Sequence, residues 1–414
     1  MTSSFPVRLA ALALALAAGA PQAQTFATPD RAAPFSAPDL ARRAAGGAVA
    51  ALPTFDSPFL GNPAHIARGG FGLNVLGVAA GVGGNAGEAW DFYNDELGPA
   101  IEEGLDEIRA NDPDRLAALY AQALDIGGRP KTTDLAVHAP AVRLAFGNVG
   151  VGAALYAQST ARAQITDGGG VPAVDLYGQA DLALPLVAGV AFDATPLGDL
   201  SLGASATVLQ RRVTAKTGPV DSFDPDAERL YLFEGTTVRL AAGALAQNVV
   251  VPGLDLGAQI SNVGGAVDYA YERSVVIEGE GAADDPAEIA ALQARFNGRG
   301  APEAVVRVGA AYRPVLLDVM PGIADTAVAL DYTSASTGTA DQSLQAGLRL
   351  GARTRLAGFF EVRAGLSQGM PSAGLGLVTR FARLEYATYG VEDGRLLGQQ
   401  RRRNHVVQLR FGLY

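Results

Sequence analysis

The stretch QSLQAGLRLGAR, residues 342–353, decides the fold because apolar and polar positions alternate along it. One face of the extended chain carries Leu344, Ala346, Leu348, Leu350 and Ala352, and the other carries Gln345, Gly347, Arg349, Gly351 and Arg353. A repeat of two residues is the repeat of a β-strand. Residues 360–366 and 374–387 show the same alternation. The C-terminal third of the chain therefore predicts β-strands, each with one apolar face.

Alternation of this kind suits a soluble β-sandwich as well as a membrane barrel, and the connections favour the barrel. Alternation and turn residues predict about fourteen strands, near residues 71–82, 134–146, 149–164, 174–192, 199–215, 230–246, 254–263, 304–312, 322–333, 342–352, 355–365, 372–380, 382–390 and 404–413. Connections after even-numbered strands are short, and most of those after odd-numbered strands are long. Short turns at one end and long loops at the other are typical of outer-membrane barrels. The expected fold is an all-β, antiparallel transmembrane barrel.

Composition agrees with an exported membrane protein. Arg8 precedes the apolar run of residues 9–18 and small residues follow, so residues 1–23 predict a signal peptide. The 414-residue chain has no cysteine, a formal net charge of −10 and 51 glycines. This charge argues against nucleic acid as a partner, because phosphate contacts need clustered lysine and arginine. No transmembrane helix is expected after the signal.

Two long connections predict helices. Residues 111–124 place Asp112 as an N-cap and Pro113 at the first helical position, and residues 284–296 repeat the arrangement with Asp285 and Pro286. The predicted organisation is a signal peptide at 1–23, an irregular Ala/Pro-rich segment at 24–70 and a barrel at 71–414. The barrel has helical inserts near 86–126 and 284–297. Both inserts follow odd-numbered strands, so we expect them on the same side of the membrane.

Two enzyme-like motifs lack the structural context that their chemistry needs. GVGGNAGEAW (81–90) contains Gly81-x-Gly83-x-x-Ala86, but a dinucleotide site needs a βαβ unit and no parallel α/β alternation follows. Gly365-Leu366-Ser367-Gln368-Gly369 matches a nucleophile elbow, but Met370-Pro371 and another strand follow where that motif needs a helix. We expect a strand-to-helix turn at the first motif and a hairpin at the second.

The other candidate groups are histidines and charged clusters. His65, His138 and His405 lie far apart in sequence and no cysteine joins them, so no catalytic site, metal site or cofactor is expected. Residues 88–114 hold ten acidic residues and only one basic residue, Arg109. This cluster is a solvated helix face or a site for cations. Arg401, Arg402 and Arg403 could meet anionic lipopolysaccharide or could simply be exposed.

Charged residues on the polar faces of the predicted strands are expected to point into the barrel lumen. These are Arg239, Asp331, Arg349, Arg353, Glu361, Arg363, Arg380, Arg383, Glu385 and Arg410. Both signs occur on neighbouring strands, which favours cross-strand pairs. A charge facing lipid would cost up to about 2–4 kcal/mol, so the strand register should be well fixed. These charges either fill the lumen as a structural ladder or line a polar pore.

Several segments resemble FadL-type outer-membrane proteins, including their conjugal-transfer TraF-like and PorV-like branches. SPFLGNPAHIAR (57–68) with Asn62-Pro63-Ala64, LDLGAQISNVG (254–264), VRVGAAYRP (306–314) and residues 362–390 carry the resemblance. The acidic helical stretch after Asn62-Pro63-Ala64 is most similar to the TraF-like branch. The last strand, HVVQLRF (405–411), is similar to their closing strands but continues to Gly412, Leu413 and Tyr414. The resemblance implies a fourteen-stranded barrel with residues 24–70 as a hatch that partly enters the lumen.

The sequence leaves three hypotheses for function. The first is a FadL-like barrel in the outer membrane of a Gram-negative-type bacterium that passes or binds a small hydrophobic compound. The second is a non-transporting TraF/PorV-like accessory barrel for conjugation or protein secretion. The third, an outer-membrane hydrolase, has no persuasive catalytic group, so we expect no enzyme. Expected partners are outer-membrane lipid, the outer-membrane assembly machinery, and a hydrophobic small molecule or a secretion or conjugation component.

Overall fold

The computed structural model describes most of the chain after residue 42. The described residues are 43–48, 50–68, 70–84, 86–128, 130–167, 172–195, 198–219, 229–276, 284–298, 304–314, 320–334, 344–392 and 401–413. The predicted signal peptide at 1–23 lies outside the described residues, and so do residues 24–42 of the predicted hatch segment.

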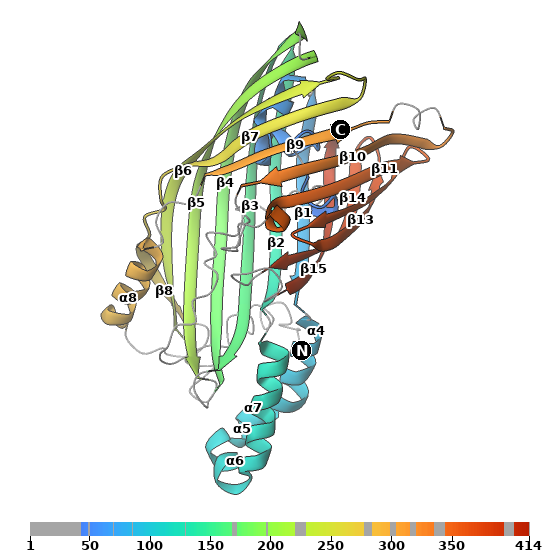
Figure 1. Ribbon diagram of the computed structural model, residues 1–414. Helices are drawn as coiled ribbons and strands as arrows, with labels where there is room; N and C mark the ends of the chain where they lie inside the picture. The colour runs from blue at the N-terminus through green and yellow to red at the C-terminus, as the bar shows by residue number, and fades with distance from the viewer. Residues whose placement is uncertain are drawn as a thin grey trace.

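The described strands form one antiparallel sheet that closes on itself as a barrel (Figure 1). The strands are β1 Gly72–Gly83, β2 Lys131–Phe146, β3 Val149–Asp167, β4 Pro172–Thr195, β5 Gly198–Pro219, β6 Arg229–Gln247, β7 Leu254–Gly264, β8 Ala270–Val276, β9 Val305–Tyr312, β10 Ile323–Thr333, β11 Leu348–Leu356, β12 Phe360–Ser367, β13 Met370–Val378, β14 Ala382–Glu392 and β15 Arg401–Leu413. The first strand pairs with the last, and the pairing of β5 with β6 completes the ring. The predicted barrel is therefore confirmed.

The fifteen strands occupy fourteen positions in the ring, because β7 and β8 share one neighbour. β7 pairs with residues 239–246 of β6, and β8 pairs with residues 229–234 of the same strand. β8 was missed in the sequence analysis, which treated residues 264–303 as a single loop. Its residues, AYERSVV, lie between turn-like and acidic stretches and show little alternation.

The wall follows the alternation of the sequence. In β13 every second residue is buried, and the residues between them, including Leu375 and Leu377, are exposed on the outer surface. β14 and β15 show the same pattern, with Leu384, Leu409 and Phe411 exposed. The outer surface is therefore apolar, whereas the inner surface carries glycine, polar and charged residues.

The wall is much taller on one side. β3, β4 and β5 have 19, 24 and 22 residues, whereas β9, β12 and β13 have 8, 8 and 9. Figure 1 shows the long green strands standing beyond the short orange and red strands on the opposite side.

The connection from β1 to β2 forms a helical arm that extends from one end of the barrel (Figure 1). Its helices are α4 Ala86–Phe92, η3 Tyr93–Leu97, α5 Gly98–Glu103, α6 Leu105–Asn111 and α7 Pro113–Gly127. Asp112 caps α7 as predicted, accepting a hydrogen bond from the Arg115 amide at 3.0 Å. Leu116 and Leu119 of α7 pack in one cluster with Ile165 of β3 and other wall residues, so the base of the arm rests on the wall.

The second predicted insert is α8, Pro286–Asn297, capped by Asp285. Phe296 of α8 is buried in an aromatic cluster with Phe233 and Tyr269, at ring-centroid distances of 5.2 and 5.7 Å. The cluster ties α8 and residues 265–269 to the wall of β4, β5 and β6. None of the helices in the described ranges is both long and apolar enough to cross a lipid bilayer.

The opening stretch of the sequence differs in part from its prediction. Residues 344–347 form a helical turn, α9 Leu344–Gly347, and β11 starts only at Leu348. The turn to β12 contains Ala357 and Gly358, both with positive φ, and lies three residues later than predicted. Alternation continues through a turn as easily as through a strand, so it could not mark where the pairing begins.

Candidate functional site

The candidate functional site is the barrel interior, which residues 43–48 and 50–68 fill on one side. This N-terminal segment includes α3 Ser57–Leu60 and the 3₁₀ helix η2 Pro63–Arg68. Glycines on six different strands allow its close approach, since a Cβ at any of them would overlap the segment: Gly150, Gly203, Gly243, Gly257, Gly351 and Gly365. The inner wall is thus shaped to accept this segment.

Asn62-Pro63-Ala64, the predicted hatch motif, lies where the segment meets β6. The Asn62 side chain is fully buried and donates to the carbonyls of Ala50 and Ala244, at 2.8 and 3.0 Å. Its Oδ1 accepts from the Ala64 amide at 3.0 Å and lies over Gly243. One amide side chain therefore joins two passes of the segment to the wall.

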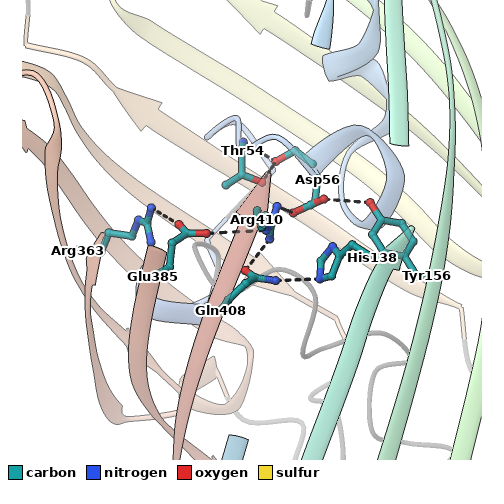
Figure 2. A network of polar contacts seen from close by, with 9 residues as sticks. Thr54, Asp56, His138, Tyr156, Arg363, Glu385, Gln408 and Arg410 are labelled. Carbon is teal, nitrogen blue, oxygen red and sulfur yellow. Dashed lines mark hydrogen bonds and ion pairs between the residues drawn. The ribbon is translucent and has the colours of Figure 1, made fainter. Parts of the chain in front are cut away.

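A polar network joins the middle of the segment to the last strand (Figure 2). Arg410 of β15 forms an ion pair with Asp56 and donates to Gln408 Oε1 at 2.8 Å. Asp56 also accepts from the Tyr156 hydroxyl of β3 at 3.0 Å. Gln408 Nε2 lies 2.8 Å from His138 Nε2 of β2. Asp56 therefore connects β15, on one side of β1, with β3, which lies beyond β2 on the other side.

The network continues along the wall through Glu385. Arg363 of β12 donates to Glu385 of β14 at 2.6 Å and to Glu361 at 2.8 Å. Glu385 also lies 3.9 Å from Arg410. All four side chains are at least 93% buried. Alternating acids and bases offset the cost of burying each charge.

Further wall side chains bind the backbone of the N-terminal segment. Asp331 of β10 accepts from the Ala50 amide at 2.8 Å, and Arg353 of β11 donates to the Pro53 carbonyl at 2.7 Å. Ser372 of β13 donates to the Ala44 carbonyl at 3.1 Å. These polar contacts add to apolar packing of the segment against the wall, as at Phe59 and Leu52.

A second buried ion pair lies on the tall side of the wall. Arg211 of β5 donates to both carboxylate oxygens of Asp181 of β4, at 2.6 and 3.1 Å. Gln179 also donates to Asp181, at 2.6 Å. Arg211 and Asp181 face the interior beside Tyr177 and Val213, which belong to the α8 cluster.

The charged residues that were predicted to face the lumen are buried, half-buried or exposed. Arg239, Asp331, Arg349, Glu361, Arg363, Glu385 and Arg410 are buried, and Arg353 and Arg383 are half-buried. Arg380 is different, because it lies in the turn between β13 and β14, is exposed and stacks over Phe381 at 5.4 Å. β13 ends at Val378, two residues before Arg380, so the inward alternation does not reach it.

The sequence analysis missed several buried polar residues of the interior. Asp181 and Arg211 lie at inward positions of strands that were predicted, so alternation alone could have marked them. Asp56 lies in an irregular segment, and His138 was considered only as a metal ligand or a catalytic residue. No sequence signal pairs Asp56 with Arg410, because the contact depends on the path of a segment without regular repeats.

The other sequence motifs have structural roles. Gly81 and Gly83 end β1, and the chain passes through Gly84 into α4, while β2 returns antiparallel to β1. Ser367 ends β12, and Gln368 and Gly369 form its two-residue hairpin turn with positive φ. Both predictions are confirmed. Among the described residues, no group of three or more His, Asp or Glu side chains could hold a metal ion.

The barrel is similar to solved structures of transporters and channels. The toluene transporter TbuX from Ralstonia pickettii aligns with a TM-score of 0.51 and 12% identity, over 90% of this chain and 97% of that chain. The deltaS2S3 mutant of the monoaromatic hydrocarbon channel TodX aligns with a TM-score of 0.50 and 11% identity, over 90% and 98%. A FadL homologue from Pseudomonas aeruginosa aligns at 0.48 and 11%, over 90% and 97%.

No protein-family model matches the chain, and no curated protein sequence matches it. The structural neighbours are transporters and channels rather than enzymes. At these identities the likeness establishes the fold, an antiparallel barrel of fourteen positions that extends over nine-tenths of the chain.

Proposed function

We propose that the chain is a FadL-like barrel that passes small hydrophobic compounds across the outer membrane of a Gram-negative-type bacterium. The observation that carries the proposal is a barrel of the fold of the toluene transporter TbuX with a segment packed inside it through local hydrogen bonds and apolar contacts. Residues 43–68 act as the hatch, and Asn62-Pro63-Ala64 fixes it to β6.

The outer surface supports a place in a membrane. The apolar band of exposed leucine and valine residues continues on neighbouring strands, as at Leu186, Leu202 and Leu240. At the short-turn end, exposed aromatic residues surround the barrel: Phe71, Phe146, Phe192, Tyr312, Phe359, Phe381 and Phe411. Aromatic girdles of this kind mark the membrane–water interface of outer-membrane barrels. The short-turn end would face the periplasm and the helical arm the exterior.

Passage through the interior requires the hatch to move. In the described structure the N-terminal segment and the polar network fill the interior between β12 and β3. The contacts that hold Ala44, Ala50 and Pro53 are single hydrogen bonds from wall side chains. Each is worth only about 0.5–3 kcal/mol, depending on charge. Release of the whole segment must also break the buried ion pair of the polar network and separate the apolar clusters. The contacts with single hydrogen bonds are therefore expected to part first.

A reversible tether tests this proposal. The chain has no cysteine, so Ala44→Cys with Ser372→Cys would introduce the only two thiols at two neighbouring residues, whose Ser372 Oγ and Ala44 carbonyl oxygen lie 3.1 Å apart. The measurement is uptake of radiolabelled toluene by cells that express the full-length chain. Uptake should exceed that of cells with an empty vector, fall in the oxidised variant and return after reduction.

The single variants Ala44→Cys and Ser372→Cys are the matched controls, and uptake by both should be insensitive to oxidant. Equal uptake with and without the chain would overturn the transport proposal. Uptake that persists in the oxidised double variant would show instead that residues 44 and 372 can stay joined during passage.

Two observations favour the second candidate, a TraF/PorV-like accessory barrel. The interior is crossed by a buried charge network, which suits a sealed lumen. The helical arm presents the exposed acids Asp95, Glu96 and Glu107 beyond the barrel. Such an arm could bind a cationic partner of a conjugation or secretion apparatus. The structural neighbours give no support for this branch in particular, so it stays second.

A photo-crosslinking amino acid tests that candidate. Placed at Glu107, on the exposed arm, it should yield one discrete adduct in living cells, whereas the same amino acid at Arg380, at the other end of the barrel, should not. If toluene is taken up but no adduct forms at Glu107, the transport function is the only candidate that remains.

The last strand also supports insertion by the outer-membrane assembly machinery. Val407, Leu409 and Phe411 alternate on the exposed face of β15, which closes the barrel against β1. A chain truncated after Phe411 should still insert into the membrane if Phe411 is the aromatic residue that the assembly machinery recognises. It should fail to insert if the residues beyond Phe411 are needed.

A further inference from the structure

The arginine triplet at the start of β15 is divided between the two surfaces of the barrel. Arg402 points inward, where its Nη1 donates to Asn404 Oδ1 at 2.6 Å and to Thr132 of β2. Arg401 and Arg403 are exposed on the outer surface. The sequence could not separate these roles, because it showed three consecutive arginines before a strand of uncertain start.

Arg403 is held flat along the outer wall. Its Nη1 lies 3.1 Å from the Pro371 carbonyl of β13 and 3.4 Å from Thr388 Oγ1 of β14. The side chain therefore reaches from β15 across β14. These contacts use one nitrogen of a guanidinium that has five N–H donors. They fix the orientation of the guanidinium group, while the Arg403 side chain stays exposed on the outer surface.

Two more polar groups lie next to Arg403 on the same surface. Tyr386 of β14 and His405 of β15 stack with ring centroids 6.3 Å apart and an interplanar angle of 23°. The Tyr386 hydroxyl lies 2.8 Å from His405 Nδ1, and His405 faces Thr388 across the strand pair. Tyrosine is typical of the level at which a membrane changes from hydrocarbon to headgroups.

The change from apolar to polar occurs at one point along β15. Val407, Leu409 and Phe411 are exposed apolar residues, whereas His405, Arg403 and Arg401 continue the same face toward the long-loop end. Arg403 is four residues from Val407, or about 13 Å along a strand. The two arginines thus lie at headgroup height above the apolar band, with an aromatic pair between.

We propose that this surface, formed by Arg401, Arg403, Thr388, Tyr386 and His405, binds the phosphate of a phosphorylated glycolipid in the outer leaflet. Arginine suits this ligand because its planar N–H groups pair with phosphate oxygens in a bidentate manner. The acyl chains would lie along Val407, Leu409 and Leu384, which are exposed on the same face. The proposal rests on the outer-membrane location proposed above.

The test compares two lipids and three proteins: the wild type, a double variant of the site and a control variant. The full chain is refolded in detergent with bisphosphorylated lipid A or with the same lipid after removal of both phosphates, and retained lipid is measured by native mass spectrometry. The wild-type chain should retain the phosphorylated lipid preferentially. Arg401→Gln with Arg403→Gln should weaken that retention about tenfold or more, since hydrogen bonds to charged groups are lost.

Arg380→Gln is the matched control, because Arg380 is also an exposed arginine but lies in the turn between β13 and β14, at the short-turn end. It should retain lipid like the wild type. Equal retention of both lipids, or equal loss in the Arg380 variant, would overturn the proposed site. If the double variant does not fold, Arg401→Gln alone and Tyr386→Phe provide the test, and wild-type retention in both would also overturn it.

Failure of this proposal is distinct from failure of the proposed function. A chain that inserts in membranes and takes up toluene but ignores the phosphates of lipid A would lack only this site. A chain that does not insert in membranes would remove the location on which the site depends.

Discussion

Asp56 and Arg410 form a buried ion pair between residues that are 354 positions apart in the chain. Asp56 belongs to the segment that fills the interior, and Arg410 to the strand that closes the barrel against β1. The pair therefore joins the proposed hatch to the last part of the barrel to be synthesised.

Replacing Asp56 with asparagine should destabilise the barrel strongly. The change keeps the size of the side chain but leaves Arg410 buried without its closest carboxylate, and loss of one partner of a buried pair costs about 3–5 kcal/mol. Urea unfolding in detergent, followed by tryptophan or tyrosine fluorescence, measures the change.

Asp193→Asn is the control for that experiment, because Asp193 also pairs with the N-terminal segment, through Arg68 at 2.7 Å, but is 61% exposed. An exposed pair is worth at most about 1 kcal/mol. If the two variants lost stability equally, burial would not be the source of the effect.

Gly243→Ala should displace the segment at Asn62. A Cβ at Gly243 would overlap Asn62 Oδ1, and overpacking of this kind costs about 1–3 kcal/mol. Limited proteolysis should then cut residues 43–68 faster than in the wild type.

Gly376→Ala is the matched change, since Gly376 is also inward on a strand but its Cβ would meet nothing closer than 3.5 Å. It should be neutral or stabilising by up to about 1 kcal/mol. Faster cleavage in both variants would mean that any added methyl group in the wall loosens the segment.

Asp181 and Arg211 should be strongly coupled. Asp181→Leu or Arg211→Met alone leaves one buried charge and should cost about 3–5 kcal/mol, whereas the double variant should cost less than either. The measurement is a double-mutant cycle of unfolding free energies. Additive losses would show that each side chain has other partners of equal importance.

The intact chain should migrate differently on a denaturing gel with and without boiling. A closed barrel in which the last strand pairs with the first has no free edge from which detergent can unfold it easily. Deletion of β15 should abolish the difference in mobility. A full-length chain of unchanged mobility that is soluble without detergent would contradict the membrane barrel.

The sequence predicted the wall well because each strand carries its own evidence. Leu375 and Leu377 alternate with glycines as in a strand with two unlike faces, and the predicted range 372–380 lies close to the observed β13. The prediction from the sequence failed at two places. β8 is short and joins the ring only because β6 extends beyond β7, and residues 344–347 turn although their alternation continues.

The interior was predicted only in part. Inward charges such as Glu385 and Arg363 follow from the alternation, but their partners depend on the shear between strands. Asp56 depends on the path of the N-terminal segment over six inward glycines, and nothing local in the sequence specifies that path.

Because its wall differs in height, the barrel would have a direction within the plane of the membrane proposed for it. The described strands β3–β5 stand on one side as a screen, while those of β9, β12 and β13 end lower. A diffusing compound would find the mouth shielded from one flank and approachable from the other. Neighbouring molecules would also meet two unlike flanks, so a crowded membrane could orient this barrel about its own axis.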